Sequence, residues 1–227
     1  MNFDRDFTQN QLINDQPQEI ISEYNGEVWY RMLLIKNKFK VIQNQNEIKY
    51  ITDDGTILRI EEIKDQSKSI EIMTNFEQIQ HLSWYGRYGK KFQKIGKWKI
   101  AWKGEILQDA GGEYCDDGKR QGQWKEVIKN YWSKAQVYEV GKYENDKRKG
   151  YWKYIYGNTE IDGGFYNEQG YKNGKWIDLN DNYWDWSQVT FHGDYQDNKR
   201  IGNWDIKLRG ELMQEISQNN IQWQWFI

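Results

Sequence analysis

The chain has few of the residues on which disulfide-rich proteins and zinc proteins depend. Its 227 residues include one cysteine, Cys115, one proline, Pro17, and two histidines, His81 and His192. A single cysteine cannot form an internal disulfide, and three Cys and His residues are too few for a zinc site made of these ligands. We therefore expect a fold held by packing alone, in a reducing, cytoplasmic compartment.

The sequence also lacks the residue patterns that catalysis and cation binding require. Cys115 has no partner at a spacing that would activate it as a nucleophile, and no glycine-rich loop precedes a helix to hold phosphate. The segment from Asp178 begins like an EF-hand loop, but Tyr183 replaces its glycine and Val189 its last carboxylate, so we interpret it as an exposed loop. We predict a protein with no catalytic residue, no cofactor and no metal site, and therefore not an enzyme.

Excess charge and long apolar runs are missing as well. Lysine and arginine number 32, against 34 aspartate and glutamate, which gives a net charge of −2. No global field would draw such a chain to nucleic acid, so we do not expect nucleic acid as a partner. No run is long enough for a transmembrane helix, and the first residues do not form a signal peptide, so we expect a soluble protein.

Aromatic residues and glycine are abundant instead. The chain has 13 Trp, 16 Tyr, 8 Phe and 20 Gly, although only 37% of its residues are hydrophobic. Aromatic side chains favour strands, where they pair across neighbours, and spaced glycines mark hairpins. The composition therefore favours an all-β fold.

A long internal repeat is the strongest signal in the sequence. Residues 111–152 align without a gap with residues 163–204, which lie 52 positions further on, and 17 of the 42 aligned positions are identical. Most of the identical positions are glycine, tyrosine or tryptophan. Self-similarity at a fixed period indicates a repeat architecture.

Each repeat divides into two shorter units of one pattern: Gly-x-Tyr, a polar stretch, and Gly-x-Trp. The polar centres, such as Asp116 to Lys119, have the residues of reverse turns, so each unit predicts a β-hairpin. We expect the tyrosine and tryptophan of each unit to be structural anchors of one sheet. The five pairs are Tyr88 and Trp98, Tyr114 and Trp124, Tyr143 and Trp152, Tyr166 and Trp176, and Tyr195 and Trp204.

The arm that follows each turn alternates in polarity. Trp98, Ile100 and Trp102 fall on one face, and Lys97 and Lys99 fall on the other, as in a half-buried strand. The glycine two positions before each aromatic residue leaves space on the aromatic face for a ring from a neighbouring strand. Together these patterns predict an elongated, twisted antiparallel sheet of tandem hairpins.

The units resemble MORN repeats, most clearly in the run from Gly164 to Trp176, GFYNEQGYKNGKW. They are still more similar to the variant in YwqK-type antitoxin proteins and in large protozoan repeat families, and the likeness covers residues 81–208. MORN repeats form long sheets of successive hairpins that serve as scaffolds, dimerisation surfaces or membrane-proximal platforms. The resemblance therefore implies a structural or protein-binding role, with an immunity-type antitoxin as a more distant alternative.

The segments outside the repeats differ in composition. Residues 1–24 are polar, and we expect a partly disordered arm. Residues 25–80 predict degenerate strands that extend the sheet or cap its end. Within them, residues 27–42 also fit a helical spacing, although β propensity favours strand. A capping-box pattern leaves a short helix over 75–82 as the alternative to a strand.

The C-terminal segment, residues 209–227, predicts capping strands. Its last seven residues, 221–227, alternate in polarity and contain no charged side chain. An uncharged aromatic strand left open invites aggregation, so we expect this one to cap its own sheet or to be buried by another chain.

The segment 87–103 is basic throughout. Its seven cations are interleaved with aromatic residues and no acidic residue; they are Arg87, Lys90, Lys91, Lys94, Lys97, Lys99 and Lys103. A solvated face balanced by acidic neighbours is one explanation, and a docking site for an anionic partner is the other. We expect a scaffold or protein-interaction module with an unidentified protein partner; the alternative is a peripheral membrane platform that binds anionic lipid through this segment.

Overall fold

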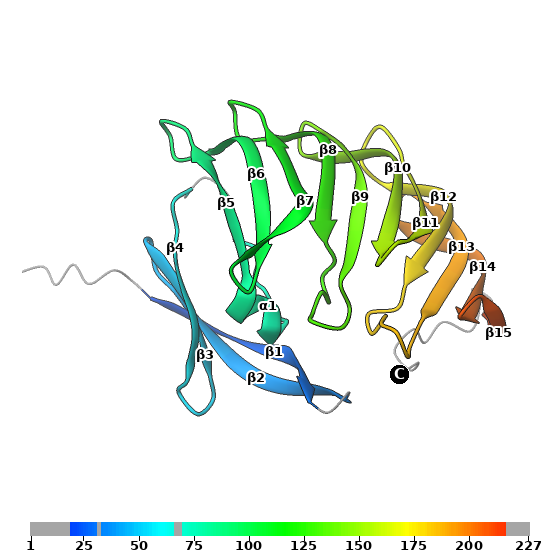
Figure 1. Ribbon diagram of the computed structural model, residues 1–227, viewed down its shortest axis with the longest axis horizontal. Helices are drawn as coiled ribbons and strands as arrows, with labels where there is room; N and C mark the ends of the chain where they lie inside the picture. The colour runs from blue at the N-terminus through cyan, green and yellow to red at the C-terminus, as the bar shows by residue number, and fades with distance from the viewer. Residues whose placement is uncertain (1–18, 31–32, 66–69, 217–227) are drawn as a thin grey trace, which may run out of the picture.

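The computed structural model describes residues 19–30, 33–65 and 70–216, which form two antiparallel sheets and one short helix (Figure 1). In both sheets every strand pairs with its neighbours in sequence, and neither sheet closes within the described residues. The predicted all-β fold of consecutive hairpins is confirmed. The small sheet comprises β1 (Ile20–Tyr30), β2 (Leu33–Gln43), β3 (Glu47–Thr52) and β4 (Ile57–Glu62).

The helix α1 (Phe76–His81) leads into the eleven-stranded sheet, which we call the repeat sheet. Its strands are β5 (Leu82–Tyr88), β6 (Lys94–Trp102), β7 (Glu105–Tyr114), β8 (Arg120–Val127), β9 (Val137–Glu144), β10 (Lys147–Tyr156), β11 (Thr159–Tyr166), β12 (Lys172–Leu179), β13 (Val189–Gln196), β14 (Lys199–Leu208) and β15 (Glu211–Ile216).

The five Gly-x-Tyr to Gly-x-Trp units form five hairpins, β5–β6 to β13–β14, that turn at the predicted polar centres. At the opposite ends of the strands the connections differ. Residues 128–136 and 180–188 are loops that lie 52 positions apart, and two-residue turns join the other hairpins. One period of the sequence is therefore two hairpins with one short turn and one loop.

Both loops place a tyrosine in the core. Tyr131 is fully buried and Tyr183 is nearly so, in a cluster that includes Ile100, Trp102 and Tyr154. The prediction of an exposed loop after Asp178 is wrong. Asp178 is itself buried at the end of β12, and the loop folds inward because its tyrosine fills the same kind of site as Tyr131.

The N-terminal flank forms a sheet of its own and does not extend the repeat sheet. The described residues of 27–42 are strand, as propensity indicated: 27–30 belong to β1 and 33–42 to β2. β1 already begins within the predicted polar arm, whose residues 1–18 lie outside the described part of the chain. The core of the small sheet, with Phe39 and Tyr50 at its centre, packs against Ile79 of α1. Hydrophobic side chains on one face of a sheet need such a cover.

The segment from Phe76 to His81 is a helix, so the preference for a strand there was wrong. The Asn75 side chain accepts hydrogen bonds from the backbone N–H groups of Glu77 and Gln78, which caps the helix. The Gln78 side chain donates to the carbonyls of Ile128, Lys129 and Tyr131. These bonds from Gln78 to a distant loop are tertiary contacts, and they favour a helix over the strand that the local sequence also allows.

Further contacts join the two sheets. The rings of Trp29 and Trp132 stack with centroids 4.3 Å apart, and Arg59 donates to the carbonyls of Ile79 and Leu82.

At the C-terminal end of the described chain, β15 pairs with β14 and continues the repeat sheet. The strand predicted for residues 221–227 lies outside the described residues.

Candidate functional site: the two faces of the repeat sheet

The ten predicted anchors form one continuous row on one face of the repeat sheet. We call this face the inner face and the row the aromatic ladder. Tyrosine and tryptophan alternate from Tyr88 to Trp204, and each ring meets the next edge to face, with centroids 4.9 to 6.1 Å apart. Edge-to-face pairs are favoured by the quadrupoles of the rings. The tryptophans are buried throughout the ladder.

The glycines of the two motifs have different roles. A Cβ at Gly141, in a Gly-x-Tyr motif, would lie 2.2 Å from the ring of Trp152, and the other four such glycines face a tryptophan ring in the same way. The predicted space for a ring is therefore confirmed for this motif. It is wrong for Gly-x-Trp: Gly150 has open space around it and a φ of +68°, which a residue with a side chain rarely adopts.

A cation lies over the ladder in every unit, four positions before the tryptophan. Its charged group is 4.1 to 4.4 Å from the centre of an aromatic ring, within the range of a cation–π interaction; the five residues are Lys94, Arg120, Arg148, Lys172 and Arg200. Of these five, only Lys94 belongs to the basic segment 87–103. The recurrence of Lys or Arg at this position was the signal that could have revealed the rest.

Buried or half-buried carboxylates pair with these cations. Arg148 donates to Glu126 at 3.0 Å and to Glu139 at 2.5 Å. Asp178 lies 2.6 Å from Lys172, 2.8 Å from Arg200 and 2.7 Å from the Tyr195 hydroxyl.

Burial alone would raise the pKa of Asp178, but Lys172, Tyr195 and Arg200 together hold that pKa below its ordinary value. Burial and the Asp178 carboxylate raise the pKa of Tyr195 to about 12. The paired charges of the inner face therefore contribute to holding the hairpins together.

The opposite face carries a second row, which we call the outer row. It consists of the central residue of each Gly-x-Tyr and Gly-x-Trp motif, and all ten side chains are exposed; in chain order they are Arg87, Lys97, Glu113, Gln123, Lys142, Tyr151, Phe165, Lys175, Asp194 and Asn203. Neighbouring units meet directly in this row. The cross-strand pairs are Lys97 with Glu113, Gln123 with Lys142, Tyr151 with Phe165, and Lys175 with Asp194.

The centre of the outer row is apolar. Tyr151 is 55% exposed and Phe165 is 51% exposed, although both are large aromatic side chains. A shallow hollow of about 460 Å³, lined in part by Lys142 and Lys149, adjoins Tyr151. An exposed aromatic pair beside a hollow can anchor a partner.

The seven cations of the basic segment do not form one patch. Arg87 and Lys97 belong to the outer row, and Lys99 is exposed on the same face. Lys94 lies on the inner face, over Trp98. The remaining three divide between the two ends of the β5–β6 hairpin.

At one end, Lys90 and Lys91 are exposed in the turn beside Phe92, which is 61% exposed. At the other end, Lys103 lies 3.2 Å from the carboxylate of Glu77. The exposed turn is thus the part of the basic segment that combines two cations with a free aromatic side chain.

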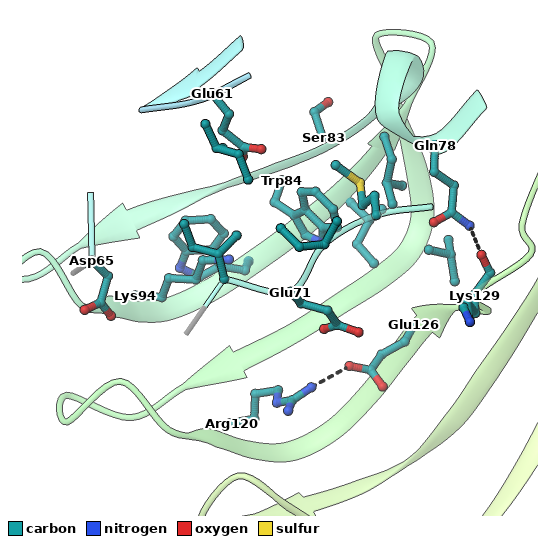
Figure 2. Close-up of a pocket in the computed structure, with 18 of the residues that line it drawn as sticks. Glu61, Asp65, Glu71, Gln78, Ser83, Trp84, Lys94, Arg120, Glu126 and Lys129 are labelled. Carbon is teal, nitrogen blue, oxygen red and sulfur yellow. Dashed lines mark hydrogen bonds and ion pairs between the residues drawn. The ribbon is translucent and has the colours of Figure 1, made fainter. Parts of the chain in front are cut away.

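A cleft of about 790 Å³ lies between the N-terminal flank and the inner face of the repeat sheet (Figure 2). Its polar walls include Glu71 from the flank and the ion pair of Arg120 with Glu126, at 3.1 Å, from β8. The volume is sufficient for a small polar molecule. Among the described residues, no group of three or more His, Cys, Asp or Glu side chains could hold a metal ion.

No protein-family model matches the chain, and no curated protein matches it. Within the described residues, no helix has the length and apolar character needed to cross a membrane. The resemblance of the hairpin units to MORN repeats therefore stays a prediction.

Proposed function

We propose that this protein is a non-enzymatic scaffold that binds a protein partner along the outer row, and that its hairpins are MORN-like units. The observation that supports this is the contrast between the two faces. The inner face repeats the same glycine, tyrosine, cation and tryptophan in every unit, whereas the exposed outer row changes its chemistry from unit to unit. Repeat proteins use such extended surfaces for binding.

The side chains of the outer row also indicate which chemical groups the partner should carry. Tyr151 and Phe165 provide a central apolar contact, and Lys142 and Lys175 lie on either side of it in the same row. Large aromatic side chains at the centre of an interface contribute most of its binding free energy. The expected partner has an apolar side chain for the aromatic pair and carboxylates for the two lysines.

Affinity capture from an extract of the cells that make the protein tests this proposal. Wild-type protein is compared with the double variant Tyr151→Ser, Phe165→Ser and with Tyr85→Ser, a control on β5 that is 52% exposed and outside the outer row. We expect a protein that wild type and the control retain and that the double variant loses. Equal retention by all three would contradict binding through the outer row.

The exposed turn of the β5–β6 hairpin favours a second candidate, a peripheral membrane platform. Phe92 projects there between Lys91 and Gln93, and Lys90 adds another cation. Co-sedimentation with phosphatidylcholine vesicles, with and without phosphatidylserine, tests it. Binding that requires the anionic lipid and is lost in the double variant Lys90→Glu, Lys91→Glu would favour this role. Absence of binding to either kind of vesicle would exclude it.

A further inference from the structure

The two long loops of the repeat sheet have the same backbone structure. Residues 128–136 and 180–188 lie 52 positions apart, and the same four backbone hydrogen bonds, of 2.9 to 3.4 Å, hold each of them. Every donor and acceptor in the first loop has its counterpart 52 positions further on. A segment that can cover one loop therefore meets the same backbone in the other.

The N-terminal part of the chain covers the first loop, 128–136. The side chain of Gln78 donates to three carbonyls of this loop, and the side chain of Asn75 donates to one of the three as well. The ring of Trp29 stacks on Trp132, with centroids 4.3 Å apart and an angle of 6° between the planes. Amide side chains and an indole ring thus form the cover.

The second loop, 180–188, receives fewer hydrogen bonds. The side chain of Asn130 donates to the carbonyl of Asp181. Among the described residues, no side chain donates to the carbonyls of Asn180 and Tyr183, whose counterparts in the first loop both accept from Gln78. Since a carbonyl can accept two hydrogen bonds, these two groups are available to amide donors.

The indole rings at the two loops form a stack that ends in an exposed ring. Trp29 and Trp132 meet Trp184 at tilted angles, and Trp186 stacks on Trp184 with centroids 5.6 Å apart and an angle of 17° between the planes. Trp186 is 67% exposed, more than any other large hydrophobic side chain of the described residues. An exposed ring at the end of such a stack marks an interaction site.

Residues 217–227 lie outside the described residues, and they carry the chemical groups that cover the first loop. Their sequence, SQNNIQWQWFI, contains five amide side chains and two indoles. It contains no charged side chain, so the segment brings no charge repulsion to the loop, whose own charged residues are Asp181 and Asp185.

The segment begins close enough to reach the second loop. Ile216 pairs with Trp204, four residues before Leu208, and Leu208 pairs with Val189, the first residue after the loop. Ile216 and Val189 are therefore separated by about 13 Å along the strands and about 10 Å across them. The nine residues that end at Trp225 span up to about 30 Å, which also bridges the last three residues of the loop.

We propose that residues 217–227 fold back over the loop 180–188, where an indole of the segment stacks on Trp186 and its amide side chains donate to the carbonyls of Asn180 and Tyr183. The segment thus covers the second loop as the N-terminal part of the chain covers the first. The proposal goes beyond the scaffold function and does not depend on it, because it uses no residue of the outer row. Its contact lies at the loop and not at the free edge of β15.

Cross-linking of the full chain in a Cys115→Ser background tests this docking. One protein carries Asp185→Cys, in the loop, together with Gln224→Cys. The matched control carries Lys199→Cys, an exposed position at the opposite end of β14, with the same Gln224→Cys. Lys199 is five residues from Trp204, about 17 Å along the strand, so the segment reaches it at least as easily as it reaches the loop. A short bis-maleimide joins each cysteine pair.

We expect the loop pair to link within one chain at least about tenfold faster than the control pair, because docking raises the local concentration of one cysteine at the other. Adding Trp186→Ser to the loop pair should remove most of this advantage. Adding Phe92→Ser instead, which removes a 61% exposed ring from the β5–β6 turn, should change nothing. Docking of a terminal segment opens locally while the sheet stays folded, so linking rates report it more directly than global denaturation.

Three outcomes would overturn the proposal. They are a control pair that links as fast as the loop pair, a loop pair whose rate does not depend on Trp186, and a link that forms between two chains, which would assign the segment to a second copy. Cys115, Asp185, Trp186 and Lys199 are exposed, so these changes should leave the sheet folded, and near-ultraviolet circular dichroism of each variant verifies this.

Discussion

At the scale of single residues, the fold depends on the fit between a glycine and a tryptophan. In each unit the tryptophan ring occupies the space where a glycine has no side chain, and its indole N–H donates to a backbone carbonyl. The ring is thus buried with its polar atom satisfied, which avoids the cost of an unpaired buried donor. Because the tryptophan rings are buried in this way, a sheet with few aliphatic residues can still form a stable hydrophobic core on one face.

The buried rings should be equivalent anchors. Replacing Trp124, Trp152, Trp176 or Trp204 by alanine should lower the free energy of unfolding by about 3 to 5 kcal/mol, because the loss of a large buried side chain leaves a cavity. Urea denaturation followed by circular dichroism measures this. Trp186→Ala is the control, since that ring is 67% exposed and its loss should cost little. Unchanged stability in two of the four variants would show that these rings are not anchors.

The two classes of glycine should respond differently to alanine. Gly141→Ala forces a Cβ against the Trp152 ring, so replacing that ring with leucine should relieve part of the damage. We expect the double variant to be more stable than the sum of the single changes implies, by about 1 kcal/mol or more. Gly150→Ala acts through its backbone φ of +68° and should be additive with Trp152→Leu. Equal coupling in both pairs would contradict the distinction.

At the scale of elements, the sequence predicted the hairpins but could not predict all of the remaining structure. Gly-x-Tyr and Gly-x-Trp located the turns, because their chemistry is local. The helix at Phe76 could not be distinguished from a strand, since it depends on bonds from Gln78 to a loop that lies 50 or more residues away. The inward loops were missed for the same reason: the site of Tyr183 is made by residues distant in sequence.

The candidate site was predicted in part. The anchors followed from the repeat, but the outer row required the register, which brings Tyr151 opposite Phe165 across two units. The basic segment looked continuous in sequence because seven cations lie within 17 residues. A hairpin separates such residues onto two faces and two ends, and sequence spacing alone does not show this.

The contact between α1 and the repeat sheet should depend on pH. Burial disfavours the Glu77 carboxylate, but hydrogen bonds from Ser133 and Lys103 outweigh it and hold the pKa of Glu77 below its ordinary value. A lowered pKa in the folded state adds stability above the unfolded value, and that stability is lost as the pH falls through the folded value. Glu77→Gln should therefore destabilise the protein at pH 7 and have a smaller effect at about pH 3.

Denaturation of wild type and Glu77→Gln at the two pH values checks this prediction. Glu62→Gln is a suitable control, because the Glu62 side chain is 73% exposed and its ion pair with Lys64 is long, at 3.6 Å. An effect of Glu77→Gln that is the same at both pH values would show that ionisation of this carboxylate does not stabilise the contact.

At the scale of the whole molecule, the repeat sheet should behave as a chain of interchangeable pieces. Each hairpin pairs with its neighbours alone, so its stability is a sum of units and of contacts between adjacent units. The gapless period of 52 residues provides a test. Deleting residues 111–162 joins Ala110 to Gly163, and Gly163 takes the place of Gly111.

The junction is geometrically equivalent to the original. A Cβ at Gly111 would lie 2.0 Å from the carbonyl oxygen of Trp98, and one at Gly163 would lie 2.4 Å from that of Trp152, so both glycines sit against the preceding tryptophan in the same way. The deletion also replaces the loop 128–136 with its copy, 180–188, which brings Trp184 to the position of Trp132. We expect a shorter sheet that still unfolds in one cooperative transition, at a lower temperature than wild type.

The control is a deletion out of phase. Removing residues 112–149 joins Gly111 to Gly150, which places the Gly-x-Trp motif of residues 150–152 at the Gly-x-Tyr positions 112–114 and puts a glycine of positive φ in the cross-strand position opposite Trp98. This chain should aggregate or unfold without cooperativity, although it loses fewer residues. Thermal denaturation followed by circular dichroism compares the two. If the in-phase deletion also fails to fold while the control does no worse, the stability of the sheet does not reside in interchangeable units.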